Sequence, residues 1–563
     1  MTLFVPSADT RSGTSAARTS TPIDALAERW VEDLIELSPV IGLRIGREVA
    51  DGYGDLSPDG HAERAARAAS TLAALDSLDP QDQVDAVTKA DLSASLSWMT
   101  DAYAAGWHLR DLNVLSSVPQ DIRQAIDLLP RATAADEERL AARLSMVPAA
   151  IAGYIATLRE GVVQGVTPAR RQAAAVAKQA SAFAAPDGFF ASVVAGTGSR
   201  ALRREVDAGV DAARVAFTSL EHFLTHDLAP AATPTDAVGR DLYSLASRHH
   251  LGTVIDPEET YRWGLDVLAQ TVAEQEAAAR ELGSTSVLEA VAELTADPRR
   301  TLTDDAKVRR WLQRESDLAM AALDDTSVEI PLELRSLQAM TSPSMQGGAH
   351  YTAPSDDLSR PGRIWWPSRK VAGPFATWRE RTTMFHEGIP GHHLQMGMAV
   401  IARGRLNTWR RQLAGSAGHS EGWALYAERL MEKLGFLEDP ADRLGMLDAQ
   451  RLRAARVVID IGVHLQLPHP DGGGWDAASA TRFLRSHTSM SDQFVRFEVD
   501  RYLGWPGQAS AYSVGLRVWN EVLDARRGAE GNGFSLREFH REALELGGVS
   551  LDALRSSSRT HNT

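Results

Sequence analysis

Apolar residues recur at helical spacing along most of this chain, and this period restricts the fold to one built mainly from packed α-helices. One such stripe consists of Leu140, Leu144, Val147, Ile151, Ile155 and Leu158. Thr133 and Asp136 precede it as capping residues, which predicts a helix that begins there. The segment Asp256-Pro-Glu-Glu259 likewise opens a helix that we expect to end near Gly283. The predicted fold class is therefore mainly α.

The length of the chain predicts more than one packed body. At 563 residues it exceeds an ordinary single domain. We expect two lobes around a central cleft, a helical lobe over residues 23–325 and a second lobe over residues 326–563. Residues 1–22 are rich in Ser and Thr, which predicts a disordered tail.

Composition narrows the partners and cofactors. Lys+Arg 59 against Asp+Glu 74 gives a net charge of -15, which disfavours nucleic acid and anionic membranes because both repel a polyanion. The chain has no cysteine, so histidine and carboxylate are the only strong metal ligands it offers. Its first residues lack the pattern of a signal peptide, and no apolar run near 18 residues follows. We expect a cytoplasmic protein with no membrane partner.

Histidines and a carboxylate gather in the segment Thr382–Gln395, Thr-Thr-Met-Phe-His-Glu-Gly-Ile-Pro-Gly-His-His-Leu-Gln. His386 is followed directly by Glu387, and two more histidines stand at 392 and 393. His-Glu with a further histidine nearby is how several zinc peptidases build their metal site, with the glutamate directed to the metal-bound water. The alternative is an interrupted helix that contains three histidines by chance.

The spacing of these histidines is unusual. His386 and His392 are six residues apart, which in an unbroken helix places them about 240° apart around the axis. The residues between them include Gly388, Pro390 and Gly391, which relax the backbone and remove a donor. We therefore expect a bulge in the helix that brings the two imidazoles together.

Glu421 is the candidate for a third ligand. It heads an apparent helix in the segment Gly418–Glu428, and a carboxylate on a second helix commonly completes a site whose first helix supplies two histidines. The alternative is a helix-terminal charge favoured by the dipole. Four of the 16 histidines lie between residues 386 and 419, which favours the ligand interpretation.

A polar stripe follows on the segment Leu447–His464. Arg453, Arg456, Asp460 and His464 recur at steps of three and four, which places them on one helix face. The other positions are so apolar that the helix is predicted to be buried, and buried charges must be paired or face a wet cleft. An internal Arg/Asp ion-pair stitch is the alternative. Further on, Tyr512 could donate to an oxyanion, although taken alone it is better explained as a packed core tyrosine.

One stretch alternates as a strand does: Val328, Ile330, Leu332 and Leu334, followed by Arg363-Ile-Trp-Trp366. Pro331 restricts it to a sheet edge, so we expect a small antiparallel β element. An edge strand can bind an extended peptide by adding it to the sheet. The alternative is a small hairpin that only caps the neighbouring site. The pair His249-His250 has no carboxylate pattern nearby, so we interpret it as helix-end or surface histidine.

Taken as a set, these motifs resemble the bacterial domain-of-unknown-function 885 (DUF885) family. The resemblance is carried by the His386–Gln395 run, the Glu421–Glu428 run, the Arg456…Asp460…His464 stripe and the Arg501-Tyr502…Tyr512…Gly515 run. That family is similar to the carboxypeptidase Taq group of zinc peptidases. The resemblance implies a multi-helix carboxypeptidase Taq-like metallopeptidase fold that covers nearly the whole chain.

The resemblance also implies roles for single residues. His386, His392 and Glu421 would bind one zinc ion, with His393 the less favoured ligand, and Glu387 would be the general base. Beyond what the resemblance implies, the mechanism that we expect uses Tyr512 or His464 to stabilise the oxyanion and Arg453, Arg456 or Arg501 to hold a substrate carboxylate. The predicted activity is that of a zinc-dependent peptidase, a carboxypeptidase, with a peptide as substrate. Two alternatives stay open: a metal-dependent amidase or esterase that acts on a small conjugate, and a non-catalytic peptide-binding protein.

Overall fold

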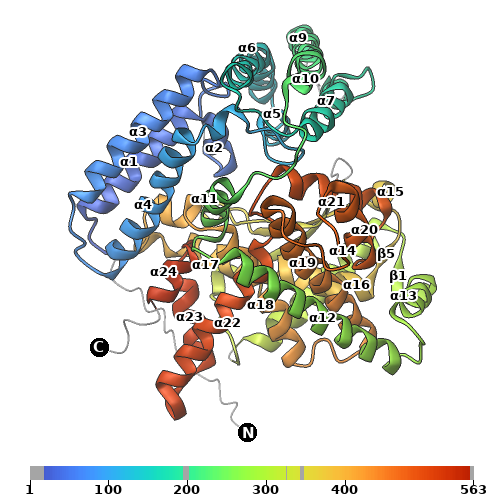
Figure 1. Cartoon of the computed structure of the whole chain (residues 1–563). Coiled ribbons are helices and arrows are strands. Elements are labelled where there is room, and N and C mark those ends of the chain that lie inside the picture. Colours follow the sequence, from blue (N-terminus) through green and yellow to red (C-terminus); the bar gives the residue numbers. More distant parts are fainter. Residues whose placement is uncertain (1–17, 48, 195–201, 325, 343–347, 558–563) are drawn as a thin grey trace.

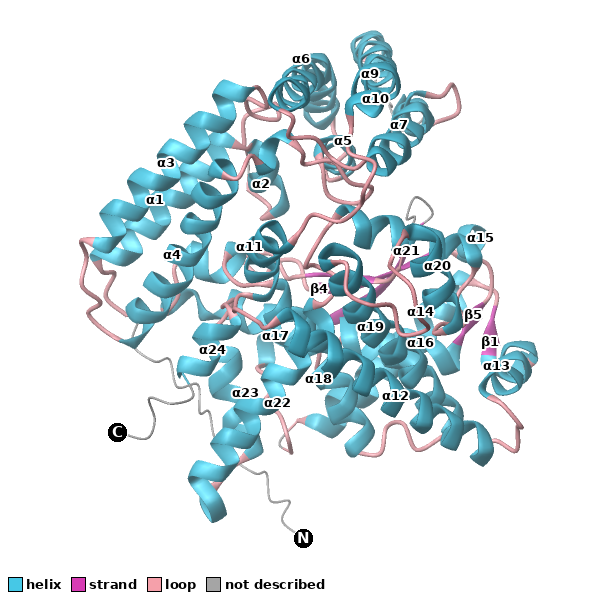
Figure 2. Cartoon of the chain, viewed as in Figure 1, coloured by secondary structure: helices cyan, strands magenta, loops and turns pink. Residues whose placement is uncertain are grey.

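The computed structural model describes residues 18–47, 49–194, 202–324, 326–342 and 348–557, so most of the predicted tail at 1–22 lies outside the described residues. Helices dominate the fold, as predicted (Figure 1, Figure 2). They are α1 (Pro22–Leu37), α2 (Pro39–Arg44), α3 (Pro58–Asp76), α4 (Gln83–Ala104), α5 (Val118–Asp127), α6 (Ala134–Gln164), α7 (Arg170–Ala184), α8 (Phe189–Val194), α9 (Arg203–Phe223), α10 (Ala229–Ala231), α11 (Arg240–Leu251), α12 (Pro257–Glu281), α13 (Val287–Ala296), α14 (Asp305–Leu323), α15 (Arg369–Ala372), α16 (Thr377–Glu387), α17 (His392–Ile401), α18 (Ala417–Lys433), α19 (Pro440–Leu465), α20 (Ala477–Ser486), α21 (Asp492–Gly504), α22 (Ala511–Glu530), α23 (Leu536–Glu545) and α24 (Leu551–Ser557). The strands are β1 (Thr301–Leu302), β2 (Leu337–Ser342), β3 (His350–Thr352), β4 (Gly362–Pro367) and β5 (Phe375–Ala376).

The N-terminal part of the chain forms a helical layer, drawn in blue to teal in Figure 1. Its helix α6 begins where the sequence predicts: Thr133 and Asp136 form a reciprocal capping box, and Gly165 ends the helix in the left-handed conformation. The predicted apolar stripe of α6 is buried against α9, and α7 packs on the other side of α9. One hydrophobic cluster, drawn from residues 40–228, unites these helices.

The C-terminal part is a larger helical body. Helix α12 lies along α19, and α18 lies along α22. Leu294 of α13 and Leu312 of α14 share one hydrophobic cluster with Trp423 of α18. Helices α12–α14 therefore pack with the C-terminal body, while α1, α3 and α4 share a smaller cluster with Trp409. The expected lobes over residues 23–325 and 326–563 stay a prediction. Helix α11 lies at the junction, where it contacts α4 on one side and α18, α19 and α22 on the other.

The β elements differ in position from the prediction. Residues 332–334 form a single 3-10 turn, and the first strand of the sheet, β2, begins only at Leu337. Val328, Ile330 and Leu334 are buried while Leu332 is exposed, so the alternation reflects burial in an irregular segment. Pro331 cannot donate to a ladder, which is consistent with the late start. Strand β4 pairs with β2 in parallel and with β3 in antiparallel register, and β1 and β5 form a second antiparallel pair.

Helix α6 also corrects one expectation about apolar runs. It is the one helix of the described residues that is long and apolar enough to cross a membrane, judged by length and composition only. Half of the relevant window is buried inside the protein, chiefly against α9. A core helix of a soluble protein satisfies the same criterion, so this feature decides nothing about a membrane.

Candidate metal centre

The two histidines of the His-Glu motif lie on separate helices. Helix α16 ends at Glu387, the chain turns through Gly388, a cis Ile389-Pro390 peptide and Gly391, and α17 begins at His392. The expected bulge is therefore a complete helix break. A Cβ at Gly391 would meet the carbonyl oxygen of His386 at 1.9 Å, so only glycine lets the chain fold back so closely. This return brings the His386 and His392 rings to 4.9 Å between centroids.

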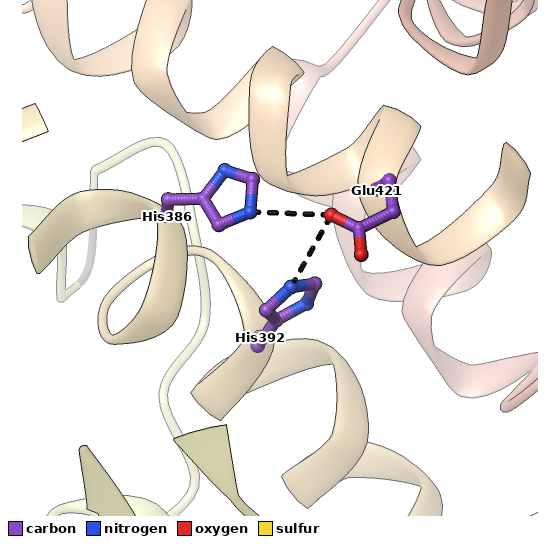
Figure 3. A group of neighbouring side chains, drawn as sticks. All are labelled: His386, His392 and Glu421. Carbon is purple, nitrogen blue, oxygen red and sulfur yellow. Dashed lines mark hydrogen bonds and ion pairs between the residues drawn. The ribbon is translucent and has the colours of Figure 1, made fainter. Parts of the chain in front are cut away.

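His386, His392 and Glu421 converge on one point (Figure 3). Glu421 lies in the first turns of α18, and its Oε2 lies 3.2 Å from Nε2 of His386 and 3.7 Å from Nε2 of His392. One ligand atom from each residue fits within 4.8 Å of the other two, and no other such group occurs in the part of the chain that the structure describes. The three residues chosen from the sequence are thus the three that the fold brings together.

His393 is occupied elsewhere, which decides between the two adjacent histidines. Its side chain is completely buried, its Nε2 lies 2.7 Å from the carbonyl oxygen of Leu334, and its Nδ1 lies 2.9 Å from the hydroxyl of Tyr351. Burial lowers the pKa of His393 to about 4, so the ring is neutral. With both nitrogens in use, His393 joins α17 to strand β3 and leaves His392 as the candidate ligand.

A second carboxylate holds His386 in place, and the sequence interpretation missed it. The Nδ1–H of His386 donates to Glu428 at 2.8 Å, and Glu428 also accepts from the hydroxyl of Thr382 at 2.9 Å. Glu428 is fully buried, seven residues after Glu421 on the same face of α18. That two-turn spacing was the available signal. A carboxylate behind a ligating histidine fixes the ring and its tautomer and leaves Nε2 for the metal.

Arg453 balances the charge of Glu428. Its guanidinium lies 3.4 Å from Glu428 Oε1 and 3.4 Å from His386 Nδ1. Burial alone would lower the pKa of His386, but the hydrogen bonds to Glu421 and Glu428 outweigh it and raise the value to about 9. The surroundings of His386 therefore favour positive charge between the imidazole and the two carboxylates.

Glu387 is placed as a proton acceptor rather than as a ligand. It is 8 % exposed, directly after His386 at the end of α16, and its carboxylate accepts no hydrogen bond from any described residue. Burial raises the pKa of Glu387, opposed by the neighbouring His386 and His392. A buried carboxylate with unengaged oxygens and a raised pKa is suited to move a proton.

The other two predicted arginines form a separate cluster. Arg456 and Arg501 both bind Glu498, at 2.6 and 3.1 Å, and Tyr502 donates to the same carboxylate. The hydroxyl of half-buried Tyr512 lies 3.4 Å from Arg501. Its ring also lies under Arg456 and Arg453, with centroid distances of 4.7 and 5.7 Å. Tyr512 thus connects this cluster with Arg453, which touches His386.

His464 is not part of the site, which corrects its assignment to the oxyanion. It lies eleven residues beyond Arg453 on α19, or about 16 Å along the helix. Its ring is completely buried, with Nε2 3.0 Å from the carbonyl oxygen of Tyr502. Asp460 does not pair with an arginine as the ion-pair alternative required. It accepts instead from Tyr243 at 3.0 Å and from the backbone of Gly507 at 3.1 Å.

The donor set fits a catalytic zinc site. Two imidazoles and one carboxylate are a known three-ligand set that leaves a fourth position for water, whereas structural zinc sites close all four. The Nδ1 of His392 is buried and has no partner among the described residues. The Nε2 of the same ring faces Glu421 and is the atom available to a metal. The residues present therefore fit a divalent metal held by His386, His392 and Glu421.

Comparison with known proteins identifies the family. The model of the family described as "Bacterial protein of unknown function (DUF885)" matches residues 39–557. The chain belongs to this family. No curated protein matches the sequence. As a DUF885 member it shares its fold with a "putative lipoprotein" from Colwellia psychrerythraea, at a TM-score of 0.82 and 20% identity over 96% of this chain and 98% of that chain. A "putative lipoprotein of unknown function" from Shewanella oneidensis matches with a TM-score of 0.72 and 16% sequence identity, over 96% of this chain and 100% of that chain.

Proposed function

We propose that this DUF885 protein is a zinc-dependent peptidase with a carboxypeptidase Taq-like fold and a central cleft. The observation that carries the proposal is the convergence of His386, His392 and Glu421, with Glu428 behind His386 and the unengaged carboxylate of Glu387 beside it. His386, His392 and Glu421 would hold the metal. When bound, zinc lowers the pKa of water toward neutrality and polarises a carbonyl group.

The chain's own residues account for the proton movements. Glu387 takes the proton of the attacking water and returns it to the leaving amine, because its carboxylate is free and its pKa is raised. Tyr512, whose ring packs against Arg453 and Arg456, is the hydroxyl donor that would stabilise the oxyanion. Arg456 and Arg501 carry two positive charges and share one carboxylate, that of Glu498. The cluster therefore keeps a net positive charge that can bind the carboxylate of a peptide C-terminus.

An open strand edge supports a peptide as substrate. In the sheet order β2-β4-β3, the outer edge of β2 is covered by α14, where Gln313 donates to the carbonyl oxygen of Leu337 at 2.9 Å. Among the residues that the structure describes, strand β3 pairs only with β4, and its Tyr351 contacts His393, the neighbour of a proposed ligand. An extended peptide added to β3 would lie beside the metal ligands.

The pairing of the arginines favours a second candidate. Arg453 is bound to Glu428, and Arg456 and Arg501 share Glu498, so each of the three already has a carboxylate. A substrate without a free carboxylate, such as a small acyl amide or ester, fits this arrangement better than a peptide C-terminus does. The non-catalytic peptide-binding alternative has no observation of its own.

Metal analysis with matched activity assays tests the proposal. We expect about one zinc per chain in the wild type and none in His386→Ala or Glu421→Ala, while exposed His222→Ala serves as the control that keeps zinc. Glu387→Gln keeps zinc and loses about 10²–10⁴-fold in turnover. Faster hydrolysis of peptides with a free C-terminal carboxylate than of C-terminally amidated peptides indicates a carboxypeptidase. The opposite preference indicates the amidase. A wild type that takes up no metal after zinc reconstitution overturns both.

The compartment follows from no structural feature. The cytoplasmic location that the N-terminal sequence predicts stays a proposal. The names of the two structural neighbours point the other way, to attachment at a membrane, at identities that establish only a shared fold.

A further inference from the structure

Five aromatic rings form a continuous row at the junction of the two helical parts. Trp107 contacts Trp98 edge-on at 5.5 Å between centroids, and Trp98 stacks on His249 at 4.3 Å and 9° between planes. His249 contacts His250 at 5.1 Å, and His250 contacts Trp505 at 5.3 Å. We call these five residues the aromatic row. They come from α4 and the turn that follows it, from the last turn of α11, and from the loop between α21 and α22.

The aromatic row is not part of a hydrophobic core. None of its members belongs to the five clusters of buried apolar side chains among the described residues. His249 is exposed, Trp98, Trp107 and Trp505 are half-buried, and only His250 is buried. The three indole N–H groups donate to no described residue. Large aromatic side chains that stay partly exposed, with a free donor each, are typical of binding surfaces.

One end of the row reaches the groups around the metal centre. Trp505 follows Arg501 by four residues, and the charge of Arg501 contributes to the lowered pKa of His250, whose largest cause is burial. Arg501 binds Tyr512, whose ring lies under Arg453, and Arg453 touches His386. The row therefore extends away from the proposed reaction centre toward α4 of the N-terminal part.

The surroundings of the row suit an uncharged aromatic group. His249 stacks on Trp98, and the packed neighbouring rings desolvate its imidazole and lower its pKa, which favours the neutral form. The nearest charged side chain on α11, Arg248, is paired with Asp101 of α4 at 3.0 Å. The indole N–H groups can donate to backbone carbonyl oxygens of a bound chain, and the rings offer stacking partners.

We propose that the aromatic row binds an aromatic side chain of an extended peptide substrate, several residues from the bond that is cleaved. The assignment of the ligand as a peptide rests on the proposed peptidase function, whereas the preference for an aromatic side chain rests on the row itself. Trp505 follows Arg501, the partner of Tyr512, by four residues, so it is the end of the row that an extended peptide leaving the metal centre would reach first. The protein would then select peptides by a residue remote from the reaction, and binding there would help to orient the bond that reacts.

Equilibrium binding separates this preference from catalysis. The Glu387→Gln variant is titrated with a series of peptides that are identical except for one residue, Phe, Trp, Leu or Ala, moved stepwise along the chain. We expect that Phe or Trp at one particular position of the peptide lowers the Kd about tenfold relative to Ala at the same position. Adding Trp98→Leu or Trp505→Leu removes that gain, and Trp98→Phe, which keeps a ring, retains most of it. Trp263→Leu on α12 is the control for loss of a half-buried tryptophan. Thermal unfolding midpoints identify any variant that has lost its fold.

The outcomes divide the two proposals. A gain that depends on Trp98 in a protein that hydrolyses no peptide supports the aromatic row and overturns the peptidase. Hydrolysis that is indifferent to Phe, Trp, Leu or Ala at every position, and unchanged by Trp98→Phe and Trp98→Leu, overturns the row and leaves the peptidase. Binding of a neutral oligosaccharide in place of every peptide, lost in Trp98→Leu, overturns the peptide as the ligand of the row.

Discussion

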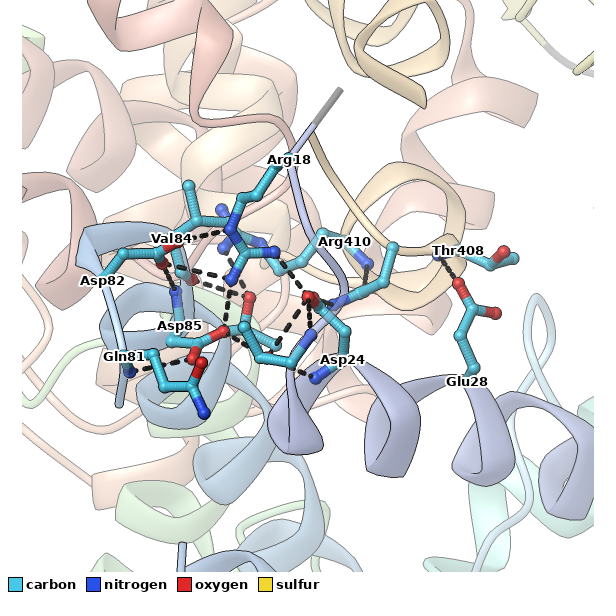
Figure 4. A network of polar contacts seen from close by, with 12 residues as sticks. Arg18, Asp24, Glu28, Gln81, Asp82, Val84, Asp85, Thr408 and Arg410 are labelled. Carbon is cyan, nitrogen blue, oxygen red and sulfur yellow. Dashed lines mark hydrogen bonds and ion pairs between the residues drawn. The ribbon is translucent and has the colours of Figure 1, made fainter. Parts of the chain in front are cut away.

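Two clusters in this molecule each set several carboxylates around one basic side chain, and they differ in how completely the polar atoms are paired. Around Arg18, the guanidinium binds Asp24, Asp82 and Asp85, and its backbone donates to Gly404 at 2.9 Å (Figure 4). Around His386, the carboxylates of Glu421 and Glu428 take the place of the aspartates. In the first cluster every carboxylate oxygen accepts a hydrogen bond from the protein. In the second, three ligand atoms face one another.

The Arg18 cluster is closed. Both oxygens of Asp85 accept, from Thr21 at 2.8 Å and from the backbone of Gln81 at 2.9 Å as well as from Arg18. Asp24 accepts from Asn407 at 2.9 Å, which attaches α1 to the C-terminal body. The metal centre is open, since His392 Nδ1 has no partner and Glu387 no donor among the described residues. Closed networks stabilise a fold, and open ones with convergent ligand atoms mark function.

The largest effect that tests this contrast is on stability at the closed cluster. Arg18→Met leaves three carboxylates, two of them buried, without their common cation, and we expect the free energy of unfolding to fall by about 3 kcal/mol. Zinc content should not change. Urea unfolding monitored by circular dichroism, with metal analysis of the same samples, measures both. Arg299→Met is the matched control, because Arg299 is 88% exposed in its pair with Asp297. If Arg18→Met abolishes zinc binding in a folded protein, the two clusters are not independent.

The next effect lies at the open cluster and concerns affinity. Glu428→Gln keeps the shape that supports His386 but removes the charge behind it, so we expect zinc affinity to fall about 10–100-fold. The same variant leaves Arg453 without its buried carboxylate, so the free energy of unfolding also falls. In the metal-free protein the pKa of His386 should move down from about 9. Competition with a zinc-sensitive dye measures the affinity, and Glu432→Gln, paired with Arg429 farther along α18, is the control. Unchanged affinity would show that Glu428 is merely a buried partner of Arg453.

The sequence predicted the second cluster better than the first, for a physical reason. His386, His392 and Glu421 stand within 36 positions and carry their chemistry in the residue types themselves. The exclusion of His393 depended on Leu334 and Tyr351, which only packing brings near. The Arg18 cluster unites residues around 18, 24, 82, 85 and 407, and no local pattern indicates such contacts.

Helical periodicity also predicted local features correctly and failed where long-range packing decides. It located α6 and α12 with their capping residues, because the burial of a stripe and the capping of an end are local events. It could not tell which part of the stripe on α19 faces the site, where Arg453 touches His386 while His464 packs against the carbonyl oxygen of Tyr502. Alternation misplaced the strand at 328–334, because buried residues in an irregular segment can alternate without a partner strand.

The smallest expected effect concerns the contribution of one charge, that of Asp82, to the stability of the closed cluster. Asp82 is the most exposed of the three aspartates at 39%, so Asp82→Asn should cost under about 1 kcal/mol. Asparagine keeps the N-cap of α4, where Asp82 accepts from the backbone of Asp85 at 2.8 Å, so the change isolates the charge. The hydrogen bond from Arg18 is the main cause of the lowered pKa of Asp82. A lowered carboxyl pKa stabilises the fold above the ordinary value of 3.8, and this contribution is lost as the pH falls below it.

The difference in unfolding free energy between wild type and Asp82→Asn should therefore be constant from pH 7 to about 5 and should shrink toward pH 3. Urea titrations at each pH measure it, and added salt should reduce it at pH 7, because an exposed pair is screened. A difference that grows as the pH falls would mean that Arg18 does not hold the Asp82 carboxylate in its charged form. The cluster would then depend on Asp24 and Asp85 alone, the two aspartates whose side chains are 6% and 0% exposed.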